Sequence, residues 1–204
     1  MHVPLLVAAS LAADYKSLTT CLASASVPFL VSSNRTWSAY ATTFNARLPY
    51  SPGAVVLPTT PSQVAAAVVC ASAHRVPVQA KSGGHSYGSF SSGGDASQRT
   101  LVVDLENFQS VAVDNVTYVA VVGGGLRLGN LALAIYAQGK RALAHGTCPS
   151  VGIGGHFTHG GYGYASRAYG RALEQSVAAD VVLANGTYVR ATSKEFPDVY
   201  WVRS

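Results

Sequence analysis

The sequence has 204 residues, of which 49% are hydrophobic and only 11% are charged. This length suffices for one domain or for a domain with a small appendage, and the composition excludes an intrinsically disordered chain. The formal net charge is +5, but the basic residues are scattered singly, so we expect no nucleic-acid partner.

The first 13 residues, 1–13, contain a short apolar core that is typical of a secretory signal peptide with cleavage after Ala12 or Ala13. The apolar start of a buried helix is the alternative. No run reaches the roughly 18 apolar residues of a membrane span, so we expect no membrane partner. Together with three glycosylation sequons, this pattern predicts a secreted, extracellular protein that is glycosylated at Asn34, Asn115 and Asn185.

An N-terminal segment of irregular pattern is expected at 14–49. Residues 14–30 begin it and predict a short helix that carries Leu18, Cys21 and Leu22 and ends before Pro28. Residues 31–50 follow without a clear period. Their aromatic side chains are expected to be packing anchors, namely Trp37, Tyr40 and Phe44.

A strand, a helix and a second strand are predicted next. Ala54–Leu57 is apolar and rich in β-branched residues, which favours a strand. Thr60 is placed to cap the following helix, with Pro61 at its first position. The apolar face of that helix would consist of Val64, Val68 and Ala71. Residues 76–79 predict the second strand.

Further strands are predicted on both sides of one more helix. Residues 91–95 indicate an exposed loop, and Leu101–Leu105 indicates a buried strand. Residues 111–113 and 118–122 predict two paired strands. A helix is expected at Leu128–Gln138, with four apolar residues available for burial: Leu131, Leu133, Ala134 and Ile135.

The last predicted element is a β-hairpin. Residues 176–183 and 188–191 would form its strands, and the Asn185-Gly186 pair would form its turn. The mixture of helices and short strands predicts an α+β fold.

Two glycine-rich segments interrupt this pattern. The first, Ala80–Gly88, follows the strand at 76–79 and would expose successive backbone N–H groups that can bind an anion. Lys81 adds a positive charge at its entrance, and His85 can act as a neutral nitrogen nucleophile. The alternative is a solvated turn with a surface histidine.

The second glycine-rich segment is His145–Gly163, and three interpretations compete for it. A dinucleotide fingerprint fails, because no strand–GxGxxG–helix unit is followed by an acidic residue about 20 positions on. A metal site is disfavoured, because the spacing of its histidines and cysteine does not match compact zinc patterns: His145, Cys148, His156 and His159. We expect no metal. The third interpretation is a flavin cradle with covalent anchors.

The three cysteines fall into two kinds of surroundings. Cys21 and Cys70 both lie in apolar, helical-looking sequence, which is consistent with a structural pair. Cys148 lies in the loop Gly146–Pro149, which suits reactivity better than burial.

Together the two glycine-rich segments resemble those of the berberine-bridge-enzyme-like FAD-linked oxidases, and they are most similar to the fungal glucooligosaccharide oxidase group. The similarity is carried by Lys81–Tyr87, His145–Pro149 and Gly152–His156. It extends over residues 18 to 200 and includes the segments 43–47, 58–60, 139–143 and 181–183. The resemblance implies a PCMH-type FAD-binding domain of two small α/β subdomains at 50–204, truncated at its C-terminal end.

The resemblance also implies roles for individual residues. His85 would bond the 8α-methyl carbon of FAD and Cys148 would bond flavin C6, chemistry that suits an imidazole and a thiolate. Lys81 would help to bind the cofactor, whose pyrophosphate would be held by Ser82, Gly83, Gly84 and Ser86. The flavin ring and ribityl chain would be lined by Thr147, Val151, Gly152, Gly155 and His156. Tyr87 and Tyr162 would face the substrate, and Cys21 and Cys70 would match the family's disulfide.

The reaction that the resemblance implies is oxidation of the C1 hydroxyl of an oligosaccharide to a lactone. Hydride would pass to FAD, and O2 would reoxidise the cofactor and release H2O2. The expected partners are the oligosaccharide and O2, and a monomer is expected. The family's catalytic tyrosine base is expected beyond residue 204, so no catalytic residue is predicted within this sequence. An oxidase that tailors alkaloids or polyketides and an inactive flavin-binding fragment are the alternatives.

Overall fold

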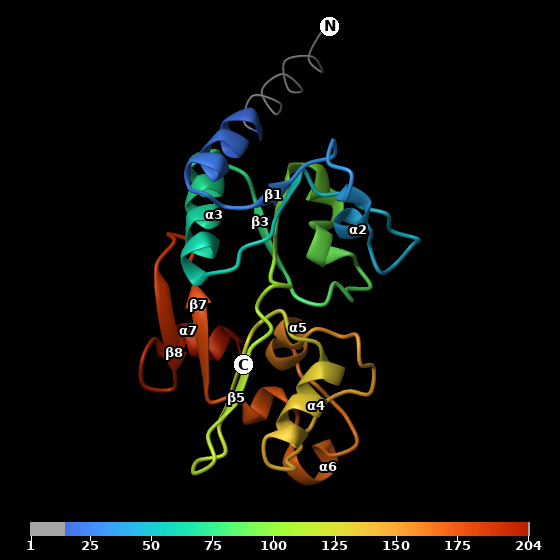
Figure 1. Cartoon of the computed structure of the whole chain (residues 1–204), viewed down its shortest axis with the longest axis vertical. Helices are drawn as coiled ribbons and strands as arrows, with labels where there is room; N and C mark the ends of the chain where they lie inside the picture. Colours follow the sequence, from blue (N-terminus) through green and yellow to red (C-terminus); the bar gives the residue numbers. More distant parts are fainter. Residues whose placement is uncertain (1–14, 204) are drawn as a thin grey trace, which may run out of the picture. The chain divides into compact units, whose positions relative to one another are not determined.

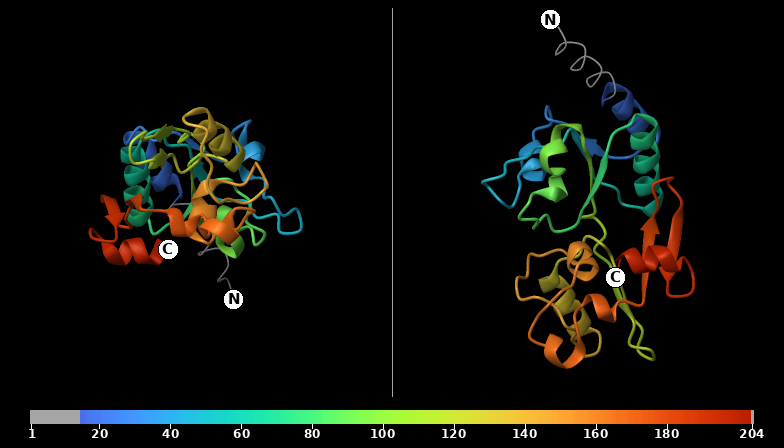
Figure 2. Two further views of the ribbon diagram at one scale, coloured as in Figure 1. Left: turned by 90° about the horizontal axis from the view of Figure 1, so that it is seen from below. Right: turned by 180° about the vertical axis from the view of Figure 1, so that it is seen from behind.

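The structure of the protein is a computed structural model that describes residues 15–203 (Figure 1). The predicted signal peptide at 1–13 lies outside these residues. Figure 2 shows the same elements from two other directions. The chain divides into two compact units. Unit 1 contains the residues up to Lys81, His85–Asp104 and Val182–Tyr188, and unit 2 contains Ser82–Gly84, Leu105–Val181 and the residues from Val189 onward.

Unit 1 is built on a four-stranded sheet. The strands β1 (Phe29–Leu30), β2 (Ala54–Val56), β3 (Val78–Lys81) and β4 (Leu101–Asp104) lie in the order β1-β2-β4-β3. β4 is parallel to both of its neighbours, and β1 is antiparallel to β2. Every residue of β2 and β4 is buried, as expected for the apolar central strands of a parallel sheet.

Helices surround this sheet within unit 1. Residues 15–24 are helical, and α2 (Trp37–Ala41) and α3 (Pro61–Ala73) follow. The Thr60 side chain accepts a hydrogen bond from the Gln63 N–H at the start of α3, so the predicted cap is confirmed. A disulfide joins Cys21 to Cys70 with a Cα–Cα distance of 5.8 Å, which confirms the predicted pair. Two 3-10 turns, η1 (Phe90–Ser92) and η2 (Gly94–Arg99), precede β4.

Unit 2 has a small core between short strands and helices. β5 (Val111–Val113) and β6 (Ala120–Val122) pair antiparallel, as predicted. The helices of this unit are α4 (Leu128–Ala137), α5 (Ile153–Thr158), α6 (Ser166–Tyr169) and α7 (Pro197–Arg203), with the 3-10 turn η3 at Leu173–Gln175. The core consists of Leu126, Leu128, Leu131, Ile135 and Ile153. β7 (Ala178–Val182) and β8 (Tyr188–Thr192) form a two-stranded sheet, which confirms the predicted hairpin.

Several predictions about local structure were wrong. The strand expected at 76–79 lies at 78–81, and the loop expected to be exposed at 91–95 contains two 3-10 turns in which Ser92 is buried. Leu133 is exposed because it lies on the side of α4 opposite the buried Leu131 and Ile135. Phe44 is also exposed and is not a core anchor. None of the helices described within residues 15–203 is long and apolar enough to cross a membrane.

Candidate functional site

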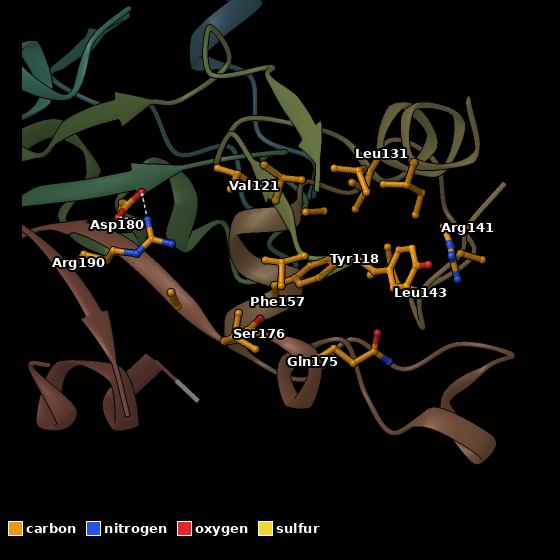
Figure 3. Close-up of a pocket in the computed structure, with 18 residues that line it drawn as sticks. Tyr118, Val121, Leu131, Arg141, Leu143, Phe157, Gln175, Ser176, Asp180 and Arg190 are labelled. Atoms are coloured by element: carbon orange, nitrogen blue, oxygen red, sulfur yellow. Dashed lines mark hydrogen bonds and ion pairs between the residues drawn. The ribbon is translucent and has the colours of Figure 1, made fainter. Parts of the chain in front are cut away.

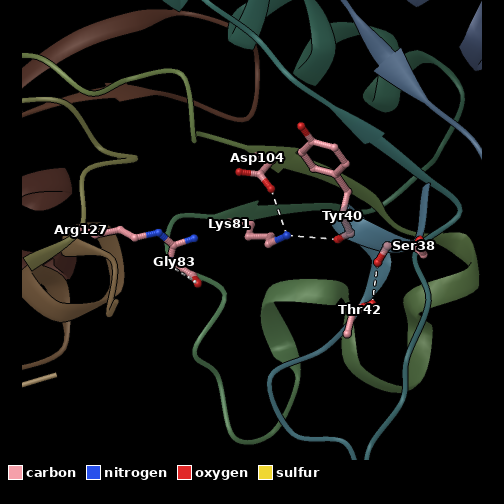
Figure 4. A network of polar contacts seen from close by, with 7 residues as sticks. All are labelled: Ser38, Tyr40, Thr42, Lys81, Gly83, Asp104 and Arg127. Atoms are coloured by element: carbon pink, nitrogen blue, oxygen red, sulfur yellow. Dashed lines mark hydrogen bonds and ion pairs between the residues drawn. The ribbon is translucent and has the colours of Figure 1, made fainter. Parts of the chain in front are cut away.

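The first glycine-rich segment begins at the carboxyl end of β3, where Lys81 is held inside unit 1. The Lys81 ammonium lies 3.0 Å from an Asp104 carboxylate oxygen and donates a hydrogen bond to the Tyr40 carbonyl at 3.1 Å (Figure 4). The side chains of Lys81 and Asp104 are only 13% and 3% exposed. The Lys81 charge is therefore balanced by a buried carboxylate, and its predicted contribution to cofactor binding stays a prediction.

His85 lies in the same loop of unit 1, four residues after the strand. Its imidazole is half-buried, and the Phe44 ring stacks on it with 4.2 Å between ring centroids. Tyr87, two residues further on, is 77% exposed, which is compatible with its predicted role toward a substrate. The side chain of Ser86 accepts a hydrogen bond from the Phe90 N–H, which closes this end of the loop.

In unit 2 the two glycine-rich segments lie against each other. An added Cβ at Gly83 would lie 2.1 Å from the backbone nitrogen of Gly152, and one at Gly152 would lie 2.0 Å from that of Gly83. Only glycine permits backbones to approach so closely. The Ser82 hydroxyl donates to the Gly124 carbonyl and accepts from the Gly154 N–H at the start of α5. The structure thus brings together predicted site residues that are some 70 positions apart in the sequence.

Arg127 ties the same two segments together from the side. Its guanidinium donates a hydrogen bond to the carbonyl oxygen of Gly83 at 3.0 Å (Figure 4) and another to that of Ser150. The backbone of Arg127 forms an isolated antiparallel bridge with Gly152. Sequence analysis missed this residue because a single arginine before a helix has no distinctive pattern. Its acceptors, Gly83 and Ser150, are 44 and 23 positions away in the sequence and come close to it only in the folded chain.

Cys148 is exposed and unpaired, as expected for a cysteine in a loop, and its reactivity stays a prediction. The residues after it are anchored on the first turn of α4, where the Gly129 N–H donates to the Pro149 carbonyl and the Leu128 N–H donates to the Val151 carbonyl, each at 2.9 Å. These bonds satisfy two donors that the start of a helix leaves free. The loop therefore holds the Cys148 thiol at the surface of unit 2 by means of its neighbours' backbone.

His156 fixes the other side of the Cys148 loop. The Gly146 N–H donates to His156 Nε2 at 2.9 Å, which requires that this nitrogen carry no proton. Burial lowers the pKa of His156 below its ordinary value, and the electrostatic influence of the neighbouring His145 imidazole lowers it further. His156 is therefore a neutral acceptor near pH 7. Among residues 15–203, no three His, Cys, Asp or Glu side chains are grouped so that they could hold a metal ion.

The remaining predicted cofactor residues leave open space of the kind a flat ligand needs. An added Cβ at Gly155 would meet no atom within 4 Å, and Thr147 is exposed, as is Tyr162. In the part of the chain that the structure describes, no hydrogen bond uses the backbone N–H of Gly83 or Gly84. Free amides, a surface made of glycine and an accessible thiol fit FAD, which presents a pyrophosphate and a flat ring.

A separate cavity of about 340 Å³ lies elsewhere in unit 2 (Figure 3). Apolar side chains such as Val121, Leu131 and Phe157 line it, together with the ion pair between Arg190 and Asp180 at 3.3 Å. None of the described residues that line it belongs to the predicted cofactor set. The cavity is therefore not the flavin cradle that the sequence predicts.

Comparison with known proteins agrees with this geometry. A model of the FAD binding domain family matches residues 52–192. The xylooligosaccharide oxidase of Thermothelomyces thermophilus is 45% identical over 185 residues, which cover 91% of this chain and 37% of that protein. The chain thus spans about 37% of the length of that curated relative.

Solved structures show the same fold. The structure of glucooligosaccharide oxidase from Acremonium strictum, a protein with a 6-S-cysteinyl, 8α-N1-histidyl FAD, matches with a TM-score of 0.86 and 40% identity, over 92% of this chain and 39% of that one. The Physcomitrella patens berberine bridge enzyme-like 1 variant D396N matches with a TM-score of 0.87 and 37% identity, over 92% of this chain and 40% of that one.

Proposed function

The chain belongs to the FAD binding domain family, among the oligosaccharide oxidases and berberine bridge enzyme-like proteins, and from this premise we propose that it is the flavin-binding part of an FAD-dependent oligosaccharide oxidase. The observation that carries the proposal is the pair of possible anchors, His85 and Cys148. Cys148 is exposed and His85 is half-buried, and each lies in a glycine-rich segment within the range that the FAD binding domain model matches.

The proposal assigns FAD two covalent bonds, one to the His85 imidazole at the 8α carbon and one to the Cys148 sulfur at C6. Each bond removes one hydrogen from the protein atom and one from the cofactor carbon. For each bond, one molecule of O2 would accept the electron pair and the two hydrogens and become H2O2. The fit rests on the exposed Cys148 thiol and on the neutral acceptor His156, which holds the Cys148 loop through the Gly146 amide.

Further residues of this chain would bind and orient the cofactor. The free amides of Gly83 and Gly84 are placed to donate to the pyrophosphate, and Gly155 leaves room for the ring. When bound, FAD supplies the hydride acceptor for oxidation of the sugar C1 hydroxyl to the lactone. Tyr87 and Tyr162 are exposed and would contact the oligosaccharide. The proton acceptor for that hydroxyl is not assigned to a residue of this chain.

Mass spectrometry under denaturing conditions tests the proposal. We expect the wild-type chain to gain the mass of one FAD that survives unfolding. His85→Ala and Cys148→Ala should each keep a covalent flavin, and the double variant should keep none. A wild-type chain that loses all flavin on acid precipitation would contradict the covalent assignment.

The substrate class is tested in a form of the protein that turns over. Peroxide should appear with cellobiose or xylobiose in the presence of O2. Peroxide from an alkaloid precursor but not from either sugar would contradict the oligosaccharide as substrate and would favour an oxidase that tailors secondary metabolites. Absence of peroxide from a chain that carries covalent FAD would identify a flavin-binding fragment.

We also propose that the protein is secreted and glycosylated. The side chains of the three sequon asparagines are exposed, as a glycan requires: Asn34, Asn115 and Asn185. Treatment of the secreted protein with an endoglycosidase should lower its mass, and each Asn→Gln substitution should remove one glycan. Retention of the protein inside the cell with an unmodified N-terminus would contradict this proposal.

A further inference from the structure

The Phe44 ring lies on the His85 imidazole in an arrangement that core packing does not explain. The two rings stack with centroids 4.2 Å apart and planes inclined by 27°. Phe44 is 49% exposed and is not one of the buried core residues of unit 1. The imidazole of His85 covers one face of its ring. The Tyr87 ring meets Phe44 edge-on, with centroids 5.6 Å apart. Phe44 therefore lies between the predicted flavin anchor and a predicted substrate contact.

A tight turn holds Phe44 in this position. The Thr43 hydroxyl donates to the carbonyl oxygen of Leu48 at 3.0 Å, and the Leu48 N–H donates to the Asn45 carbonyl at 3.0 Å. The Asn45 carboxamide oxygen accepts from the Arg47 N–H at 3.1 Å. These bonds fix the backbone on both sides of Phe44 and therefore the point from which its ring projects toward His85.

The same turn is tied to the loop that carries His85. The Asn45 carboxamide nitrogen donates to the Tyr87 carbonyl at 2.7 Å, two residues beyond His85. The Ser89 hydroxyl donates to the Leu48 carbonyl at 3.0 Å. The turn at 43–48 and the His85 loop are therefore joined at the backbone as well as through the stacked rings, and their relative position is fixed within unit 1.

We propose that Phe44 is a positioning residue that fixes the plane of the His85 imidazole for bond formation with FAD. The inference rests on the proposed function. The bond joins an imidazole nitrogen to the 8α-methyl carbon, with loss of the N–H and one C–H hydrogen, and O2 takes the electron pair and becomes H2O2. A nitrogen lone pair must point at that carbon, and stacking leaves the ring free to tilt by only a small angle.

The test measures the two covalent bonds separately. In a Cys148→Ala background only the histidyl bond can form, and in a His85→Ala background only the cysteinyl bond can form. Phe44→Ala is introduced into each background, the apoprotein of the full 204-residue chain is mixed with FAD in air-saturated buffer, and acid-stable flavin is followed with time. Because Cys148 lies in unit 2, its bond reports on general folding but not on the stack in unit 1.

We expect Phe44→Ala to slow the histidyl bond about tenfold, since misplacing a reacting group by about 1 Å can cost up to roughly a hundredfold. The cysteinyl bond should form at its usual rate. Phe44→Tyr should restore the histidyl rate, whereas Phe44→Leu, which is apolar but has no ring to stack, should not. Phe90→Ala is the matched control, because Phe90 is an exposed phenylalanine of the same loop that does not stack on His85.

An unchanged histidyl rate, or equal slowing of both bonds, would overturn the proposal while leaving the proposed function intact. A wild-type chain that forms neither bond would overturn the proposed function and the inference with it. A second readout needs no cofactor. In apoprotein, the His85 Hε1 proton resonance, identified by its loss in His85→Ala, should move in Phe44→Ala and not in Phe90→Ala. An unmoved resonance would show that the stack does not exist in solution and would overturn the proposal.

Discussion

Unit 1 and unit 2 each hold one of the proposed flavin anchors, but they hold it by different means. In unit 1 the anchor loop leaves a sheet whose central strand β4 is buried on both faces, and a disulfide and a buried ion pair brace the surrounding elements. In unit 2 the strands occur in pairs, and the anchor loop is held by close contact between glycines, by Arg127 and by the first turn of α4.

A loop that carries a reactive side chain can thus be held either by covalent and apolar bracing or by close backbone approach with a few hydrogen bonds. Strands buried on both faces and a cross-link tolerate many side-chain changes around them. A contact between two glycines tolerates no added atom, because there is no side chain whose rotation could relieve the clash. We therefore expect the stability of unit 1 to be most sensitive to loss of the Cys21–Cys70 disulfide. The stability of unit 2 should be most sensitive to a methyl group added at the contact between Gly83 and Gly152.

Removing the disulfide should give the largest effect. Cys21→Ser with Cys70→Ser opens a link between residues separated by 49 positions, which we expect to lower the free energy of unfolding by about 4 kcal/mol. Urea unfolding followed by circular dichroism measures this loss. Cys148→Ser is the matched control and should leave the free energy of unfolding unchanged, because Cys148 is exposed and unpaired. Equal stability of the double variant and wild type would show that the disulfide does not stabilise unit 1.

Gly152→Ala tests the contact between glycines in unit 2. The added methyl group would lie 2.0 Å from the Gly83 nitrogen, and backbone on both sides must move, so we expect a loss of about 3 kcal/mol. Gly155→Ala adds the same group where no atom lies within 4 Å and should not destabilise the protein. Similar stability of the two variants would show that the segments do not approach each other so closely.

Most of the fold could be predicted from sequence, because the apolar strands, the cap at Thr60 and the glycines are local signals. β4 and α3 follow from patterns of this kind. Arg127 and Phe44 could not be predicted, because each contacts a segment about 40 residues away or more through a geometry that only the folded chain creates. The prediction for β3 began two residues too early, at 76 instead of 78. Pro77 lies in the apolar run on which the prediction was based, but proline has no N–H to donate to the sheet.

Loss of the Arg127 side chain should have a smaller effect on unit 2. Arg127→Ala removes two hydrogen bonds from a charged donor to backbone carbonyls, and we expect the protein to lose about 2 kcal/mol of stability. Arg127→Lys keeps the charge but lacks the guanidinium Nη1, the one nitrogen that donates to both carbonyls, so it should recover only part of the loss. Thermal unfolding measures both variants, and full recovery by lysine would mean that charge alone matters.

In unit 1, the Tyr15 hydroxyl is buried and has no hydrogen-bond partner among the described residues. Tyr15→Phe removes that unsatisfied group and should stabilise the protein by about 1 kcal/mol. Burial raises the Tyr15 pKa from 10.0 to about 12. The unfolded chain therefore loses the Tyr15 proton first, so stability is unaffected by this group below pH 10 and falls as the pH rises toward 12. A stability curve of Tyr15→Phe that falls as steeply as that of wild type in this window would contradict the account.

In unit 2 we expect a smaller effect on the free energy of unfolding, which appears at acidic pH. The lowered pKa of His156 means that the unfolded chain binds its proton first, so stability falls as the pH drops below the ordinary histidine value of 6.5. His156→Gln, which can still accept from the Gly146 N–H but does not titrate, should flatten the stability curve between pH 7 and 5. If the stability of the variant falls with pH as steeply as that of wild type, a group other than His156 takes up the proton.

A tryptic digest of the FAD-loaded chain tests whether a single flavin is bonded to both His85 and Cys148. Cleavage after Lys81 and Arg99 releases residues 82–99 with His85, and cleavage after Arg141 and Arg167 releases residues 142–167 with Cys148. We predict one species in which a single FAD joins these two peptides, and its mass equals the sum of all three minus four hydrogens. Recovery of both peptides unmodified, or of flavin on only one of them, would contradict an anchor in each unit.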